Sequence, residues 1–163
     1  MLFHRTNFIR RVIKISILDI ISPLYHSKRL YYLLESIASS NYTSEVIITL
    51  VSDGDNEDYS SILKQFENKI KINYLSYFKN QGPSIARQYG LDHSSAPFIM
   101  FIDSDDIFLP KGLDILIETI KSYPDNYLYL FDFIENKIIH SKIDHFGCMG
   151  QVYARNFLKL YNI

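Results

Sequence analysis

Three carboxylates within four residues follow an apolar run in the middle of the chain. Asp103, Asp105 and Asp106 stand directly after PFIMFI, residues 97–102. Asp103 and Asp105 are two residues apart, so an extended backbone directs both side chains to one side. Two carboxylates that close repel each other unless a proton or a cation lies between them. Because Mg²⁺ and Mn²⁺ prefer oxygen ligands, the motif predicts a metal site. The alternative is that these acids cap a helix beginning near Pro110.

Short apolar runs alternate with segments of helical periodicity, and these elements must position the acids. The predicted strands cover residues 14–21, 46–51, 70–76 and 97–102, and a further apolar run covers 127–134. The predicted helices carry the face Leu30, Leu33, Leu34 and Ile37, the stripe from Tyr59 to Phe66, a segment from Pro83 towards Ser94, and the face Leu113, Leu116, Ile117 and Ile120. This alternation predicts an α/β domain with a mainly parallel sheet. Ligands of such sheets bind outside the carboxyl ends of the strands, where the acids stand.

Length and composition limit the classes of protein that remain. With 163 residues, 47% hydrophobic and 21% charged, the chain suits one folded domain. We expect residues 1–12 to be an N-terminal extension and residues 13–163 to be the domain. The net charge of −1 gives no global support to sequence-independent nucleic-acid binding. The single Cys148 excludes an internal disulfide framework.

The compartment is predicted from what the sequence lacks. No apolar run approaches the roughly 20 residues of a membrane helix, so we expect no transmembrane segment. The single cysteine fits a reducing compartment, and a cytoplasmic location is expected. The basic, aromatic stretch 1–11 could touch an anionic surface, which extends the expectation to the inner face of a membrane.

Residues 80–109 carry a resemblance to a known family. This stretch, NQGPSIARQYGLDHSSAPFIMFIDSDDIFL, resembles the central block of family 2 glycosyltransferases of the GT-A fold. That block has an N-x-G turn, a small-residue helix with an Arg, an apolar strand and D-S-D-D, followed by an aromatic residue and a Pro. The resemblance implies a Rossmann-like three-layer α/β/α sandwich. It also implies an inverting hexosyltransferase that uses a nucleotide-diphosphate sugar, UDP-linked, with Mn²⁺ or Mg²⁺.

The same resemblance assigns roles to individual residues. It gives the metal to Asp103 and Asp105, and the nucleotide sugar to Pro23, Tyr25, Asp53, Arg87, Asp103 and Ser104. Pro23 and Tyr25 match a Pro-x-Tyr-Asn motif whose Tyr packs near the base, although His26 stands where Asn is usual. Asp53 matches the acid that accepts a hydrogen bond from the base, in a motif whose first acid is replaced by Ser52.

The catalytic base is the part of the pattern that the chain does not supply. Inverting transfer needs a general base to deprotonate the acceptor hydroxyl. In the family this base is an Asp or Glu, often in a Glu-Asp pair, and the chain reaches Ile163 without such a pair. Asp132, Glu135 and Asp144 remain as candidates, and none stands in the matching place. The catalytic residue is therefore unknown, and the chain is expected to be a fragment, to work with another polypeptide, or to be inactive.

Two other functions remain open at this point. Nucleotidyl transfer also uses paired acids on an α/β sheet, but residues 23–29 (PLYHSKR) make a poor phosphate loop. A nucleotide-sugar-binding module that has lost turnover is the second alternative. The acceptor stays open among a glycan, a lipid carrier and modified DNA. By the resemblance, His145 and Gly147 would border its pocket.

Overall fold

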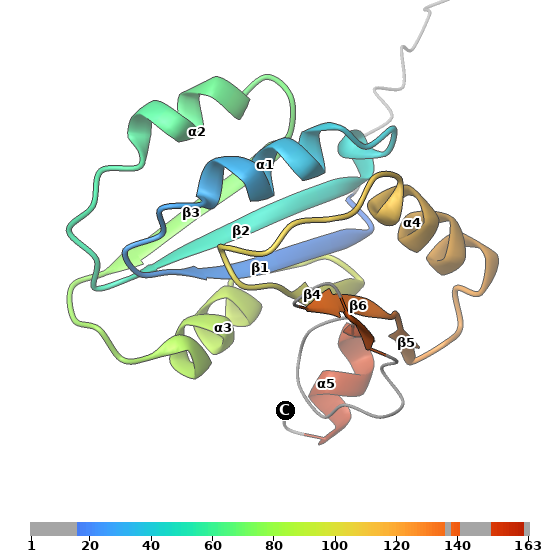
Figure 1. The fold of residues 1–163 in the computed structure, drawn as a ribbon. Coiled ribbons are helices and arrows are strands. Elements are labelled where there is room, and N and C mark those ends of the chain that lie inside the picture. Colours follow the sequence, from blue (N-terminus) through green and yellow to red (C-terminus); the bar gives the residue numbers. More distant parts are fainter. Residues whose placement is uncertain (1–15, 136–137, 141–150, 162–163) are drawn as a thin grey trace, which may run out of the picture.

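Six strands form the main sheet, in the order β3-β2-β1-β4-β8-β5 (Figure 1). The computed structural model describes residues 16–135, 138–140 and 151–161. The strands of this sheet are β1 (Leu18–Leu24), β2 (Val46–Asp53), β3 (Lys71–Tyr77), β4 (Phe98–Phe101), β5 (Leu128–Leu130) and β8 (Gln151–Ala154). Strands β1 to β4 pair in parallel, whereas β8 runs antiparallel to both β4 and β5. The predicted mainly parallel α/β sheet is confirmed.

Helices cover both faces of this sheet and complete a three-layer sandwich. The helices are α1 (Leu30–Ala38), α2 (Ser60–Phe66), α3 (Pro83–Asp92), α4 (Gly112–Ser122) and α5 (Arg155–Tyr161), with a short 3-10 helix at Thr43–Glu45. Figure 1 shows α1, α2 and α4 on one face and α3 and α5 on the other. The larger apolar cluster lies under α1 and α4, and the smaller one under α3 and α5.

Apolar periodicity explains why α1 and α4 form where the sequence predicts them. All four apolar positions of each predicted face are buried: Leu30, Leu33, Leu34 and Ile37 in α1, and Leu113, Leu116, Ile117 and Ile120 in α4. Most helix stability in a domain comes from packing such a face against a sheet. In the part of the chain that the structure describes, no helix is long and apolar enough to cross a membrane.

The first strand extends further along the chain than its apolar run. It ends at Leu24 rather than Ile21, and so includes Pro23. Strand β4 ends opposite Ile21, whose carbonyl accepts the N–H of Ile102. Since alternate residues of a strand bond to the same neighbour, the nitrogen of Pro23 faces the side where β4 has already ended. Its missing N–H therefore costs no ladder hydrogen bond.

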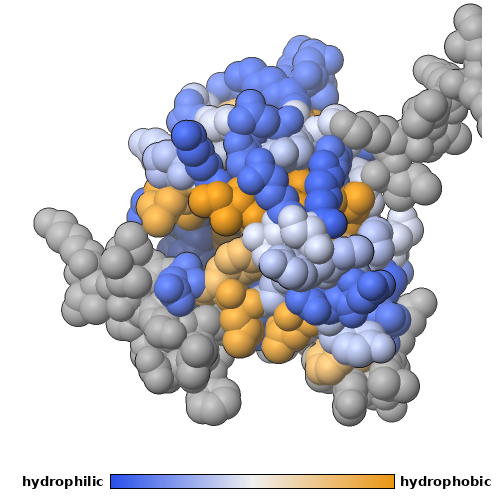
Figure 2. All heavy atoms as spheres, turned by 90° about the vertical axis from the view of Figure 1, so that its right-hand side faces the viewer, coloured by the Kyte–Doolittle hydropathy of each residue, from blue (hydrophilic) through white to orange (hydrophobic). Residues whose placement is uncertain are grey.

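The apolar run 127–134 divides between two sheets. Leu128–Leu130 forms β5 against β8, whereas Phe133–Glu135 forms β6, which pairs with β7 (Ile138–His140) in a separate two-stranded sheet. Composition does not reveal the division, because both halves are apolar. Figure 2 shows this end of the molecule, where a hydrophobic band runs across the middle of the surface below a hydrophilic area. Leu128 and Leu130 are partly exposed there, as expected for an edge strand.

Candidate functional site

The acidic turn after β4 lies beside an arginine from α3. Nη2 of Arg87 is 2.5 Å from Oδ1 of Asp103. The Arg87 side chain is 20% exposed and that of Asp103 is 47% exposed, while Asp105 is exposed. A charge-assisted bond this open to solvent can exchange for another partner. The pair therefore offers both a cationic and an anionic group to a ligand at the carboxyl end of β4.

The carboxylates of this turn are crowded, and the crowding affects the pKa of Asp106. Burial raises the pKa of Asp106, and the charges of Asp103 and Asp105 raise it further. Oδ2 of Asp106 is buried and has no hydrogen-bond partner among the described residues. A divalent cation between these acids would relieve the repulsion, since it favours the ionised form of each one. The residues present thus fit Mg²⁺ or Mn²⁺, with Asp103 and Asp105 as the accessible ligands.

Asp53, at the end of β2, holds the loop that leads into α3. Its two carboxylate oxygens accept the backbone N–H groups of Gln81 and Gly82, at 2.7 and 2.8 Å. Asp53 is only 2% exposed. Both burial and the adjacent charge of Asp53 raise the pKa of Tyr77, which pairs with it in register on β3. Asp53 thus anchors the N-x-G turn, and its carboxylate retains acceptor capacity for one further donor.

The same loop depends on a glycine that the sequence motif also contains. Gly54 has a φ of +63°, and a Cβ there would lie 2.1 Å from the backbone nitrogen of Asn80. Only a residue without a side chain permits so close an approach between the turn after β2 and the turn before α3. The two motifs, far apart in sequence, are therefore packed backbone to backbone.

The turn after β1 supplies an exposed aromatic ring and a link to the acidic turn. Tyr25 is 53% exposed, and its ring centre lies 4.3 Å from that of His26. The hydroxyl of Ser27 lies 2.6 Å from that of Ser104, which stands between the two predicted metal ligands. Pro23 is partly buried at the end of the strand. The turn thus connects the predicted base-binding residue with the predicted metal-binding turn.

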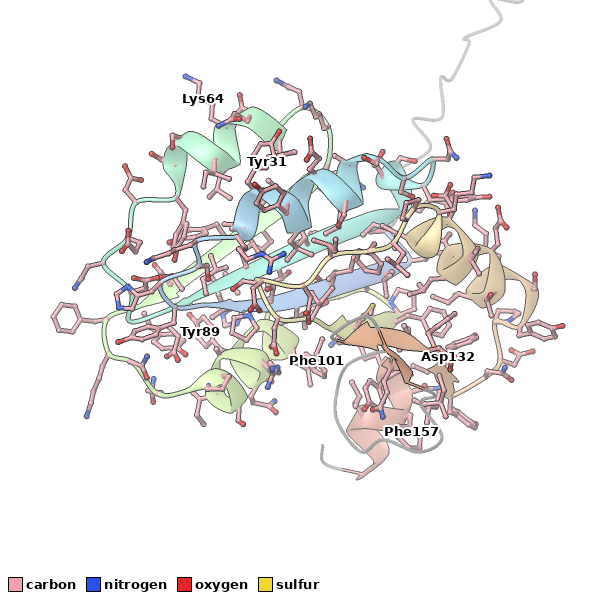
Figure 3. All side chains as sticks on the ribbon, in the orientation of Figure 1. Tyr31, Lys64, Tyr89, Phe101, Asp132 and Phe157 are labelled. Atoms are coloured by element: carbon pink, nitrogen blue, oxygen red, sulfur yellow. The ribbon has the colours of Figure 1, made fainter. Side chains whose placement is uncertain are left out.

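These contacts bring some of the predicted residues together at the carboxyl edge of the sheet. Arg87 and Asp103 form one group, to which Ser104 and Ser27 are joined, and Asp53 holds the loop at the start of the helix that carries Arg87. Figure 3 shows the two layers that meet the sheet, with Tyr31 on α1 on one side and Tyr89 on α3 on the other. The direct binding roles of Pro23, Tyr25 and Asp53 stay predictions.

Two of the predicted base candidates lie at the small two-stranded sheet. Asp132 is exposed between β5 and β6, and Glu135 ends β6. Asp144, His145 and Gly147 lie outside the described residues. Among the described residues, the contacts given above bring only the acids of the acidic turn next to Asp103.

Several contacts of this edge were not predicted from the sequence. Ser27, Gln81 and Tyr59 contribute through a hydroxyl or a backbone N–H, which short motifs do not specify. The hydroxyl of Tyr59 donates to Asp55 at 2.5 Å and accepts the N–H of Ser27 at 3.0 Å. The signal that could have indicated Tyr59 is its place on the predicted apolar stripe, because a tyrosine buried there, as it is just before α2, needs a partner for its hydroxyl.

Comparison with known proteins identifies the family of the chain. The family model described as Glycosyl transferase family 2 matches residues 19–161. An uncharacterized glycosyltransferase of Rickettsia bellii (strain RML369-C) is 30% identical over 125 residues, which cover 76% of this chain and 17% of that protein. The chain therefore spans a minor part of this relative.

Solved structures show the same fold. TarS of S. aureus (residues 1–349), in complex with UDP-GlcNAc, matches with a TM-score of 0.79 and 20% identity, covering 90% of this chain and 47% of that one. The mannosyltransferase PcManGT of Pyrobaculum calidifontis, in complex with GDP-Man and Mn²⁺, matches with a TM-score of 0.69 and 12% identity over 90% of this chain and 47% of its own. Both matches cover the GT-A sandwich predicted above. With the family model matching most of its length, the chain belongs to glycosyl transferase family 2.

Proposed function

We propose that this domain binds a UDP-linked sugar together with Mn²⁺ or Mg²⁺, and transfers the sugar with inversion to a hydroxyl acceptor. The observation that carries the proposal is the Arg87–Asp103 pair, at the carboxyl edge of the sheet and on a turn crowded with carboxylates. The complexes of TarS with UDP-GlcNAc and of PcManGT with GDP-Man and Mn²⁺ support a nucleotide sugar and a divalent metal as ligands of this fold.

Each residue of the edge has a distinct task in this proposal. Asp103 and Asp105 would hold the metal, which when bound neutralises charge on the leaving diphosphate. Arg87 exchanges its bond to Asp103 for a phosphate oxygen, for which its planar fork is suited. Ser104 supports the turn through Ser27 and adds a hydroxyl near the phosphates.

The base of the nucleotide would lie over the turns after β1 and β2. Tyr25 is exposed enough to stack on a uracil ring. Asp53 would accept the N–H of that ring while it continues to hold Gln81 and Gly82. Pro23 shapes the turn because its fixed φ limits the path of the chain. This division of roles favours uridine, whose ring presents one N–H between two carbonyl groups.

Nucleotide selectivity and turnover test the proposal separately. In isothermal titration with saturating Mn²⁺, we expect UDP to bind at least about tenfold more tightly than GDP or CDP, a difference of about 1.4 kcal/mol. Equal binding of all three nucleotides, or none, would contradict the assignment. Release of UDP from UDP-sugars then distinguishes an active transferase from a module that only binds the donor.

A further inference from the structure

Three metal-ligating side chains meet beside the site, on the loops that follow β1 and β2. Nδ1 of His26 lies 3.6 Å from Oδ1 of Asp55 and 3.4 Å from Oε1 of Glu57. One ligand atom from each of the three residues lies within 4.8 Å of the other two. None of these residues belongs to the acidic turn after β4, and none has a role in the proposed transfer.

The spacing suits a small transition-metal ion. Zinc bonds to nitrogen and oxygen of about 2.0 to 2.1 Å place two tetrahedral ligands about 3.3 to 3.4 Å apart. The two distances from His26 are close to this value, so a cation could enter with small side-chain adjustments. Imidazole nitrogen and carboxylate oxygen are both zinc ligands, and with three protein ligands a fourth position would remain for water.

Asp55 forms the buried side of this cluster, whereas His26 and Glu57 form its solvent-exposed side. The Asp55 side chain is fully buried, while those of His26 and Glu57 are 57% and 58% exposed. Burial opposes ionisation of Asp55, but hydrogen bonds from Tyr59 and from the N–H groups of His26 and Glu57 outweigh it and lower its pKa. An ionised carboxylate that is held in place next to two accessible ligands is positioned to bind a cation.

We propose that His26, Asp55 and Glu57 form a second divalent-cation site, selective for zinc-like ions over Mg²⁺. An imidazole nitrogen is a poor ligand for Mg²⁺, which distinguishes this site from the all-carboxylate turn. A cation here would tie the turn after β1 to the turn after β2. The tie adjoins Tyr25, whose ring packs on His26, and Ser27, whose hydroxyl contacts Ser104.

His26→Asn is the matched variant for this proposal. His26 has a φ of +52°, which asparagine tolerates well, and its N–H bond to Asp55 does not involve the ring. The chain's other four histidines and Cys148 remain in this variant and control for binding elsewhere. Glu57→Gln is the second variant, because the Glu57 side chain is exposed and its contact here is with His26.

Zinc and cobalt binding to the full chain tests the site. By isothermal titration at neutral pH, we expect zinc affinity to fall at least about tenfold in His26→Asn and in Glu57→Gln. It should be unchanged in Asp92→Asn, which alters an exposed acid at the end of α3 outside both sites, and the visible absorption of Co²⁺ should follow the same pattern. Unchanged zinc affinity in His26→Asn, or no zinc binding by the unmodified chain, would overturn the proposal. UDP binding with Mn²⁺ is measured separately, so failure of the proposed transfer would be recognised independently.

Discussion

Two aspartates near an arginine stand towards opposite ends of the sheet, and their surroundings differ. Asp103 and Arg87 form a direct pair that is open to solvent. Asp19, near the start of β1, is 1% exposed; it accepts a hydrogen bond from Thr49 and lies in the field of Arg155. The same two residue types therefore have different roles in the two places. The open pair is available to a ligand, whereas the buried aspartate of the first strand lies only in the electrostatic field of an arginine at the start of the C-terminal helix.

The buried group is held by main-chain contacts rather than by a direct ion pair. Nε of Arg155 donates to the carbonyl of Ala96 at 2.8 Å, and its Nη1 to that of Leu91 at 3.4 Å. Oδ1 of Asp19 and Nη2 of Arg155 are buried without hydrogen-bond partners in the described chain. Burial raises the pKa of Asp19 to about 6, even though Ser94, Thr49 and Arg155 offset part of the effect.

The largest effect is expected from Arg155→Ala. This change removes two hydrogen bonds to carbonyl groups and leaves Asp19 without its nearby cation. We expect the free energy of unfolding to fall by roughly 3 kcal/mol in urea denaturation. Lys64→Ala is the control, since Lys64 points away from α2 into solvent (Figure 3). A loss no greater than that of Lys64→Ala would show that the buried group does not hold the C-terminal helix.

Asp103→Asn should separate ligand binding from stability. We expect UDP affinity in the presence of Mn²⁺ to fall about 100-fold, or about 2.7 kcal/mol, because a charged metal ligand is lost. The free energy of unfolding should change by less than about 1 kcal/mol, since the side chain is half exposed. Asp92→Asn, at an exposed position at the end of α3, is the control. Equal effects of the two variants on UDP affinity would remove Asp103 from the site.

Asp19→Asn should change how stability depends on pH. The folded pKa of about 6 lies above the ordinary value of 3.8, so the folded chain holds this proton more tightly than the unfolded chain. The resulting stabilisation is complete below about pH 4 and is lost as pH rises to about 6. Between about pH 4 and about pH 6, the free energy of unfolding of the unmodified chain should therefore fall. The fall should be about 2 kcal/mol smaller in Asp19→Asn. Parallel pH profiles of the two proteins would contradict the buried assignment.

The smallest effect is expected from Arg87→Lys. Lysine keeps the charge beside Asp103 but lacks the planar fork that binds two oxygens. We expect UDP binding with Mn²⁺ to weaken about tenfold, or about 1.4 kcal/mol, while the thermal midpoint stays nearly constant. An unchanged affinity would mean that Arg87 acts only as a point charge at the edge of the sheet.

The sequence predicted those parts of the molecule that depend on local pattern. The buried faces of α1 and α4 follow from helical periodicity, and the position of Asp103 follows from an apolar strand ending at Phe101. Contacts between distant segments were not predicted, because no local pattern specifies them. His26 meets Asp55 across 29 residues, and Asp53 binds two backbone N–H groups that have no sequence signature. Asp19 could be noticed as an acid in a strand, but its partner Arg155 becomes apparent only when β8 pairs with β4.

The metal dependence of UDP binding tests the central claim most directly. Isothermal titration of the full chain with UDP should be run with Mn²⁺ and again with a chelator. If Asp103 and Asp105 hold a cation that contacts the diphosphate, the affinity should rise at least about tenfold with Mn²⁺. An affinity that is the same in both conditions would contradict a metal-assisted donor site on the acidic turn.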